Sequence, residues 1–264
     1  MDRKYKIALC QMLVSNDKDE NREKAARLVN EAAAAGAKVV CLPEIWNSPY
    51  DVKKFAGYEE PSDGPSVRLM SGLARENGIF LIGGSIPERG EGGMYNTSFV
   101  FDPSGAVIAR HRKVHLFDVD IEGGIHFKES DFFAAGDALT TFDTDFGTMG
   151  LAICFDVRFP EMFRQMTRAG AHIIFLPASF NMTTGPVHWD LLMRSRALDN
   201  QIFFAACSPA RDLSASYHSW GHSCIATPWG DYCGAADQRE TIVYGVVDRD
   251  YQDKIRQEIP LGKH

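Results

Sequence analysis

Three chemically capable side chains lie at or just beyond the ends of short apolar runs in the sequence. Cys154, Glu44 and Lys113 each follow a run that is typical of a buried strand. They supply a nucleophile, a general base and a cation that can stabilise an oxyanion. This set is complete for acyl transfer through a thioester. Because open α/β sheets bind ligands at the carboxyl ends of strands, we expect the three side chains to meet there.

Taken singly, each of these residues has a structural explanation that its position alone favours. Cys154 fits a buried structural cysteine, Glu44 a helix N-cap or surface ion pair, and Lys113 an exposed loop lysine. The residues after Cys154 predict a helix with Pro160 and Glu161 near its first turn. Backbone N–H groups and the helix dipole at such a junction favour a thiolate over a thiol.

The elements that must position these residues alternate between short apolar runs and longer helical patterns, which predicts an α/β fold. AGAKVVCLPE at 35–44 resembles AGAHIIFLPA at 169–178, and each segment follows a strand pattern and a helix pattern. Gly36 and Gly170 suit the C-termini of those helices. Two such units suggest two sheets packed face to face with helices outside, although chance similarity explains the repeat equally well.

The remaining patterns predict the other elements of the same fold. Helices are expected near 20–35, 65–76, 160–168 and 187–199, strands at 79–84, 201–207 and 242–247, and hairpins around 102–105 and 228–231. Glu88–Gly93 is expected to be a loop. We expect one domain over 1–264, with a core at about 5–247 and a C-terminal tail at 248–264.

Composition argues against several classes of protein. The 264 residues are 45% hydrophobic and 24% charged, which is ordinary globular usage. The net charge of −7 gives no support for nucleic-acid binding. No apolar run approaches a membrane span, and no cleavage site follows the N-terminal run. Six cysteines without C-x-x-C spacing suggest a reducing compartment, so we expect a cytoplasmic protein.

Two histidine pairs have the i, i+4 spacing of zinc ligands on a helix. His111 and His115 lie in a strand-to-loop segment, and the segment between His218 and His222 is poor helix material. Neither pair has an evident third ligand. We therefore expect no metal, and nothing in the sequence indicates a cofactor.

The sequence resembles the nitrilase superfamily of carbon–nitrogen hydrolases. LPE at 42–44, HRKVHLFD at 111–118 and GLAICFDVRFPE at 150–161 carry the resemblance, which covers about 5–247. It implies a four-layer αββα sandwich with two mixed sheets packed face to face and helices outside. It also implies a homodimer or higher homo-oligomer that acts on small-molecule amides.

The resemblance also assigns roles to residues. The family's nucleophile, base and cation correspond to Cys154, Glu44 and Lys113. A second family glutamate, which positions the lysine and the substrate, corresponds to Glu129 in HFKES. The backbone N–H of Phe155 is expected to complete the oxyanion site.

Within the superfamily the sequence is most similar to the omega-amidase, or Nit2-like, branch. The segments that support this are NSPYD at 47–51, KVHLFDVDI at 113–121, FKES at 127–130, SFNMTTGPVHW at 179–189, RSRALDNQ at 194–201 and SPARD at 208–212. Such enzymes hydrolyse the terminal amide of 2-oxoglutaramate and 2-oxosuccinamate to the 2-oxo acid and ammonia. At 122–124 the chain has Glu-Gly-Gly where the branch usually has Pro-Gly-Lys, which leaves fine specificity open.

A 2-oxo dicarboxylic monoamide carries a carboxylate away from its scissile amide, so its pocket needs a cation and hydroxyl donors. Arg158 follows Cys154 by about one helical turn and is the expected cation, although a structural salt bridge would also explain it. The other expected pocket residues are Tyr50, Thr183 and Thr184 as hydroxyl donors and Phe180 as an apolar wall.

Two other functions stay open from the sequence. The first is another amidase of the superfamily, acting on an N-carbamoyl compound or on deaminated glutathione. The second is a catalytically inactive partner-binding protein, against which the intact cysteine, glutamate and lysine argue.

Overall fold

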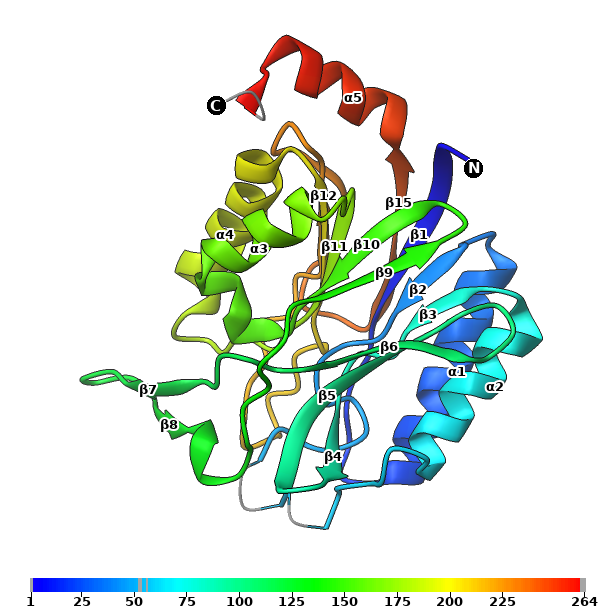
Figure 1. Cartoon of the computed structure of the whole chain (residues 1–264). Coiled ribbons are helices and arrows are strands. Elements are labelled where there is room, and N and C mark those ends of the chain that lie inside the picture. The colour runs from blue at the N-terminus through cyan, green and yellow to red at the C-terminus, as the bar shows by residue number, and fades with distance from the viewer. Residues whose placement is uncertain (1, 52–53, 56, 262–264) are drawn as a thin grey trace.

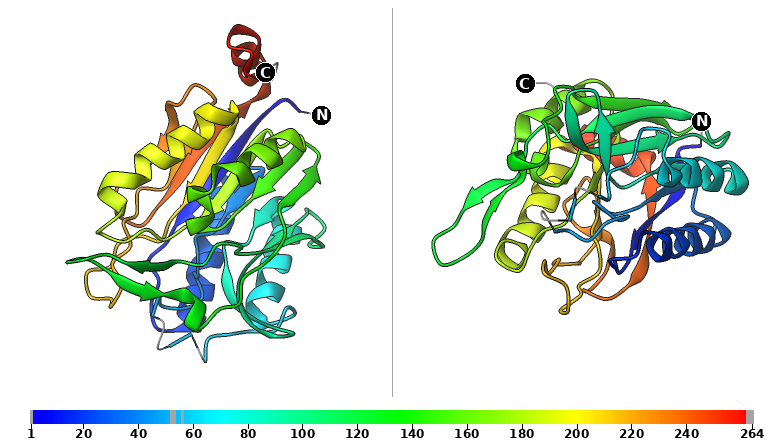
Figure 2. Two further views of the ribbon diagram at one scale, coloured as in Figure 1. Left: turned by 60° about the vertical axis from the view of Figure 1, so that its left-hand side comes forward. Right: turned by 90° about the horizontal axis from the view of Figure 1, so that it is seen from below.

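Two mixed β-sheets lie face to face between two pairs of helices (Figure 1). The computed structural model describes residues 2–51, 54–55 and 57–261. Figure 2 shows the same arrangement turned by 60° about the vertical axis and seen from below. This is the predicted αββα sandwich. Within the described ranges, no helix is both long and apolar enough to cross a membrane.

The first sheet has seven strands in the order β15-β1-β2-β3-β5-β4, with β6 paired to β5. Its strands are β1 (Lys4–Gln11), β2 (Val39–Cys41), β3 (Phe80–Ile82), β4 (Ile86–Gly90), β5 (Gly93–Phe101), β6 (Val107–Arg112) and β15 (Thr241–Asp248). The strands β1, β2 and β3 are parallel, and the others join them antiparallel.

The second sheet has six strands in the order β14-β13-β12-β11-β10-β9. They are β9 (Thr140–Thr144), β10 (Gly147–Leu151), β11 (Ile173–Pro177), β12 (Phe203–Cys207), β13 (Cys224–Ala226) and β14 (Tyr232–Ala235). Its parallel strands β10, β11 and β12 correspond to β1, β2 and β3 of the first sheet. The sequence repeat therefore marks two equivalent strand–helix–strand units.

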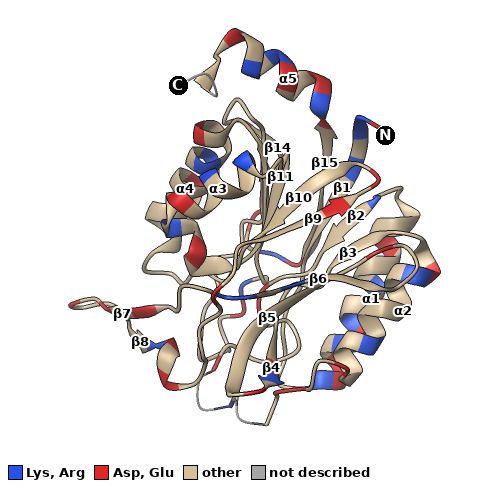
Figure 3. Ribbon diagram, viewed as in Figure 1, with Lys and Arg blue, Asp and Glu red and all other residues tan. Residues whose placement is uncertain are grey.

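Alternating side chains on the parallel strands separate an inner core from two outer cores. On β1, Ile7 and Leu9 face the other sheet, whereas Ala8 and Cys10 face helices. The helices α1 (Lys18–Ala34) and α2 (Pro65–Asn77) cover the first sheet, α3 (Pro160–Arg168) and α4 (Gly185–Asn200) cover the second, and α5 (Arg249–Glu258) follows β15. Figure 3 shows charged residues gathered on helices and loops, whereas the central strands are mainly uncharged.

One sequence prediction needs correction, and two elements were not predicted. Glu88–Gly93 is not a loop, because β4 and β5 pair antiparallel up to Gly90 and Gly93 and form an edge hairpin. The helix α3 starts at Pro160 as predicted, where proline suits the first helical turn, but a separate 3-10 helix, η2 (Cys154–Arg158), precedes it. The hairpin of β7 (Asp118–Asp120) and β8 (His126–Lys128), which projects from the body in Figure 1, was not predicted.

Gly84 lets two strand ends approach each other closely beside Glu44. Its φ is +61°, and a Cβ at this position would lie 2.2 Å from the carbonyl oxygen of Pro43. That carbonyl accepts a hydrogen bond from the Ser85 N–H at 3.1 Å, and the Ser85 hydroxyl accepts one from the Ile45 N–H at 3.0 Å. The backbone on both sides of Glu44 is therefore fixed by the chain that follows β3.

Gly84→Ala is expected to destabilise the protein much more than Gly78→Ala. Gly78 has nearly the same φ, +60°, but nothing lies within 4 Å of a Cβ there. Gly78→Ala should lower the free energy of unfolding by about 1–2 kcal/mol for the left-handed backbone alone. Gly84→Ala should lower it by roughly 2 kcal/mol more, because the backbone must move as well. Urea denaturation measures both, and equal losses would contradict the close approach.

Candidate active site

The three predicted chemical residues meet in the interior where β2, β6 and β10 end. Glu44 lies three residues after β2, Lys113 directly after β6, and Cys154 at the start of η2 after β10. Their exposed fractions are 1%, 1% and 5%. The carboxylate of Glu44 lies close enough to the Cys154 thiol to raise its pKa, and it also binds Lys113. The structure therefore brings together side chains from both sheets.

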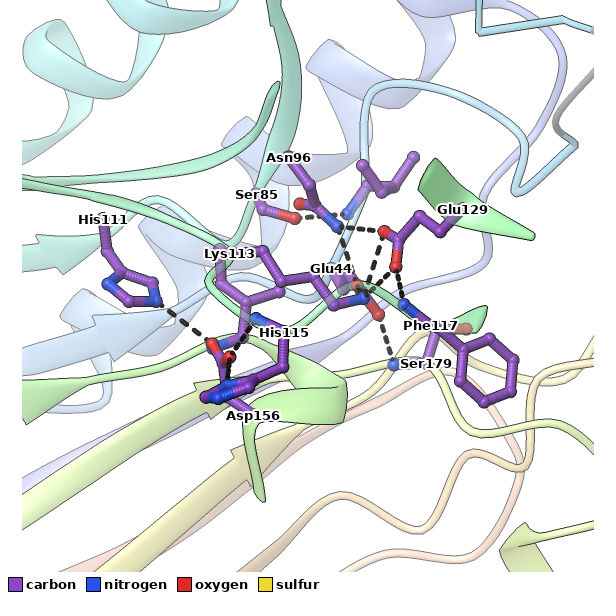
Figure 4. Close-up of polar contacts among 12 residues, drawn as sticks. Glu44, Ser85, Asn96, His111, Lys113, His115, Phe117, Glu129, Asp156 and Ser179 are labelled. Carbon is purple, nitrogen blue, oxygen red and sulfur yellow. Dashed lines mark hydrogen bonds and ion pairs between the residues drawn. The ribbon is translucent and has the colours of Figure 1, made fainter. Parts of the chain in front are cut away.

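The ammonium of Lys113 lies between two buried carboxylates (Figure 4). Its Nζ is 3.0 Å from Oε1 of Glu44 and 2.8 Å from Oε2 of Glu129. Oε2 of Glu129 also accepts the backbone N–H of Phe117. Burial opposes the charged form of Lys113, but Glu129 and Glu44 outweigh it and raise the pKa of the ammonium well above its ordinary value. Lys113 is therefore a permanent cation.

Asn96 is a member of this group that the sequence interpretation missed. It lies on β5, is fully buried, and donates from Nδ2 to Glu44 at 2.9 Å and to Glu129 at 3.3 Å. The sequence interpretation placed it only near the hairpin predicted around 102–105. The feature that could have identified Asn96 is an amide side chain on a strand that is buried from that residue onward, because a buried amide needs hydrogen-bond partners.

Burial raises the pKa values of both Glu44 and the neighbouring Cys154. Burial raises the pKa of Glu44, and the charge of Glu129 adds to this effect while Lys113 opposes it. Burial also raises the pKa of the Cys154 thiol well above its ordinary value, and the Glu44 carboxylate raises it further. The expectation of a thiolate at this junction is therefore wrong for the resting site. The thiol needs a base, and Glu44 is the carboxylate that contacts it.

The two oxygens of Glu44 have different surroundings. Oε1 accepts from Lys113 at 3.0 Å and from Asn96 at 2.9 Å. Oε2 accepts the backbone N–H of Ser179 at 2.8 Å. Two donors at Oε1 hold the carboxylate in one orientation, so Oε2 is the oxygen better suited to exchange a proton with the thiol.

The backbone is strained at both places where Glu44 and Cys154 follow their strands. Cys154 has a φ of +46°, and Ile45, which follows Glu44, has a φ of +50°. Non-glycine residues are uncommon in this region, and a β-branched one such as isoleucine is an outlier. Each costs about 1–3 kcal/mol and persists only where its surroundings hold it. At Cys154 this conformation turns the side chain towards Glu44.

The buried carboxylate of Asp156 holds the Cys154 turn. It accepts the N–H of Ile153 at 3.0 Å, both the N–H and Nδ1 of His115 at 2.9 and 2.8 Å, and Nε2 of His111 at 3.1 Å. These donors outweigh burial and hold the pKa of Asp156 well below its usual range. Figure 4 shows the two histidines converging on this carboxylate.

This network gives the first histidine pair a role other than metal binding. His111 and His115 each place a ring nitrogen against the carboxylate of Asp156, and these contacts connect the segment around Lys113 with the turn that contains Cys154. Across the part of the chain that the structure describes, no group of three or more histidine, cysteine, aspartate or glutamate side chains could hold a metal ion.

Arg158 is the expected substrate cation, and it lies close to the nucleophile. Its guanidinium sits 5.5 Å from the ring centre of Phe155 and 5.3 Å from that of Phe180. Its nearest polar partner is Nδ1 of His188 at 3.2 Å, and among the described residues no carboxylate forms an ion pair with it. A structural salt bridge therefore does not explain it. Burial lowers its pKa from the ordinary value.

The other predicted pocket residues are more dispersed. Thr184 is buried and directs its hydroxyl to Oδ1 of Asn181 at 3.3 Å, whereas Thr183 is exposed. A Cβ on Gly124 would lie 3.3 Å from the Thr183 methyl, so the departing 122–124 segment lies against the expected pocket. Tyr50 lies on the Glu44 side of the site.

Tyr217 is a second residue that the sequence interpretation missed. Its ring packs against that of Tyr50 with ring centres 4.5 Å apart and an interplanar angle of 31°, and its hydroxyl donates to the carbonyl of Ser179 at 2.6 Å. Burial raises the pKa of its phenol well above the ordinary value, and the charges of Cys154 and Glu44 add to the effect. No spacing rule could have found it, because the contact joins two distant loops.

An αββα sandwich with a cysteine, a lysine and two glutamates buried at its strand ends is the architecture of a hydrolase that works through a cysteine. The family model for carbon-nitrogen hydrolase matches residues 6–257. The chain therefore belongs to the carbon–nitrogen hydrolase family, the nitrilase superfamily of the sequence prediction.

Named relatives agree with this assignment. The chain is 47% identical to Omega-amidase NIT2 of Xenopus tropicalis over 98% of its own length and 94% of that protein. It is 47% identical to Omega-amidase NIT2 of Homo sapiens, over 97% and 93%. The crystal structure of Saccharomyces cerevisiae Nit3, a member of branch 10 of the nitrilase superfamily, superposes with a TM-score of 0.91 at 40% identity, covering 98% of this chain and 95% of that one.

Asp156→Asn is expected to impair both stability and turnover. An asparagine amide would turn a donor towards groups that are all donors, so at least one hydrogen bond to an ionised group is lost. We expect the free energy of unfolding to fall by about 2–4 kcal/mol. We also expect kcat to fall more than tenfold with a smaller change in KM, because Arg158 is left in place.

Asp145→Asn serves as the matched control, because Asp145 is exposed. Urea denaturation and steady-state ammonia release measure the two effects. An Asp156→Asn variant that matched the control in both would show that the carboxylate does not hold the Cys154 turn.

Proposed function

We propose that this protein is an omega-amidase, which hydrolyses the terminal amide of 2-oxo dicarboxylic monoamides such as 2-oxoglutaramate and 2-oxosuccinamate. The observation that carries the proposal is Arg158, a half-buried cation without a carboxylate partner among the described residues, beside the buried Cys154 thiol. A substrate carboxylate is the partner it lacks. The names of the relatives with 47% identity support the same substrate class.

In the acylation half-reaction, Oε2 of Glu44 takes the thiol proton while Sγ of Cys154 forms a bond to the amide carbon. Lys113 and the backbone N–H of Phe155 stabilise the negative charge that develops on the carbonyl oxygen. Glu44 then gives the proton to the amide nitrogen, the C–N bond breaks, and ammonia leaves. The acyl group remains as a thioester on Cys154.

In the deacylation half-reaction, Glu44 takes a proton from water as the water oxygen bonds to the thioester carbon. The C–S bond then breaks, and Glu44 returns its proton to the sulfur. The raised pKa of Glu44 suits this exchange, since the carboxylate must both take and give a proton. Glu129 and Asn96 keep Lys113 and Glu44 in place throughout.

The substrate side of the site combines a charge with aromatic walls. Arg158 lies against Phe155 and Phe180, and Phe155 packs on Phe117 with ring centres 5.2 Å apart. Such walls exclude water and strengthen a charge-assisted hydrogen bond to the substrate carboxylate.

An assembly of at least two copies and a cytoplasmic location stay predictions. An exposed apolar strip on α4 supports the first of these. Val187, Leu191 and Leu198 on α4 are 68%, 65% and 48% exposed, and a strip of this kind is typical of a protein interface.

Arg158→Met is expected to act on the substrate carboxylate alone. For 2-oxoglutaramate, kcat/KM should fall about 100-fold, which corresponds to the roughly 2–3 kcal/mol of a hydrogen bond to a charged group. For 4-oxopentanamide, which lacks the carboxylate, the variant and the wild type should differ by less than threefold. Ammonia release over both amides measures the effect, with Cys154→Ala as the inactive control.

Equal losses on the two amides would mean that Arg158 does not recognise the carboxylate. The same assay should include an N-carbamoyl amino acid and deaminated glutathione. A wild-type kcat/KM for either that exceeds the value for 2-oxoglutaramate would replace the proposed substrate class with that of the other superfamily amidases.

A further inference from the structure

A cavity of about 570 Å³ reaches Glu44 without contacting Arg158. Its described lining includes Glu44 and Ile45 but neither Arg158 nor Phe180. It extends to the exposed residues Asn16, Lys54 and Ser216, so it connects a buried carboxylate with the molecular surface. Its walls come from the segments 14–16, 44–50 and 209–219 and from Lys54.

The packed ring pair of Tyr50 and Tyr217 belongs to the wall of this cavity. The Tyr217 hydroxyl donates to the carbonyl of Ser179, and the Ser179 N–H donates to Oε2 of Glu44. The hydroxyls of Ser179 and Ser219 are 2.8 Å apart, and Ser219 also lines the cavity. The cavity wall is thus hydrogen-bonded to Ser179, whose backbone N–H binds the Glu44 carboxylate.

The proposed reaction needs a small reactant at Glu44 while the acyl group is in place. During the thioester stage the acyl chain is bonded to Cys154, and its carboxylate lies at Arg158. The Arg158 side of the site is then occupied. Water must still reach Glu44 and the thioester carbon, and it must do so from another direction.

We propose that this cavity is the passage through which hydrolytic water reaches Glu44, an inference that rests on the proposed function. Water loses a proton to Glu44, its oxygen bonds to the thioester carbon, the C–S bond breaks and the proton passes to sulfur. The cavity supplies the water and a continuous path for its replacement.

The lining suits water better than an apolar ligand. Small hydroxyl side chains recur along it, from Ser15, Ser48, Ser214, Ser216 and Ser219. Each water in liquid occupies about 30 Å³ and needs two to four polar partners, so the volume holds a chain of waters with partners available. Glu44 at the buried end is a charge-assisted acceptor for the last of them.

Narrowing the cavity tests the proposal. Ala215 is half-buried and lines the cavity, so Ala215→Phe places a ring there. Leu213→Phe is the matched control, because Leu213 lies in the same loop, is 73% exposed and is not among the lining residues. Asn16→Phe narrows the cavity from a different loop and guards against a local folding defect. Circular dichroism checks the fold of all three.

With 2-oxoglutaramate, both narrowing variants should slow deacylation only. We expect kcat and KM to fall together by about fivefold or more, kcat/KM to change by less than twofold, and the acylated enzyme to rise in intact-protein mass spectra. Leu213→Phe should match the wild type.

Three outcomes would overturn the passage. The first is that the narrowing variants have unchanged kinetics. The second is a raised KM at unchanged kcat, which would make the cavity an entrance for the whole substrate. The third is a lower kcat/KM without accumulation of acylated enzyme. If the wild type itself released no ammonia from 2-oxoglutaramate, the proposed function would fail first. If the wild type releases ammonia and the narrowing variants have the same kinetics, only the water passage is contradicted.

Discussion

The contact on which the site depends is the buried ammonium of Lys113 between Glu44 and Glu129. None of the three side chains is more than 1% exposed, and one cation faces two carboxylates. Removing one member of such a group costs about 3–5 kcal/mol, because a charge is left buried without a partner. Burial raises the pKa of Glu44, and the charge of Glu129 adds to this effect while Lys113 opposes it, so the carboxylate can hold a proton briefly and pass it on.

A second buried network shares the same chain segment. His111 and Lys113 are two residues apart at the end of β6, so they face the same side, where one holds Asp156 and the other holds Glu44. Asp156 in turn fixes the left-handed backbone at Cys154. One strand end thus positions both the base and the nucleophile. The strain at Cys154 is sustained by hydrogen bonds to a neighbouring carboxylate rather than by the local sequence.

The sequence was informative where local patterns decide the outcome. Short apolar runs between helical patterns predicted the strands and the two strand–helix–strand units, and strand ends predicted the meeting of Glu44, Lys113 and Cys154. Asn96 and Tyr217 were missed because their roles arise from contacts between segments far apart in the chain. The thiolate at Cys154 was wrongly expected, since the junction is a five-residue 3-10 helix in a buried site beside a carboxylate.

The central claim is that Cys154 carries the acyl group, and trapping that group tests it most directly. The protein is mixed with saturating 2-oxoglutaramate, quenched in acid at steady state, digested and analysed by mass spectrometry, with a parallel sample that contains hydroxylamine. The account predicts an acyl adduct on the Cys154 peptide, conversion to the hydroxamate when hydroxylamine is present, and neither product from Glu44→Gln. Continued ammonia release with no adduct and no hydroxamate would contradict it.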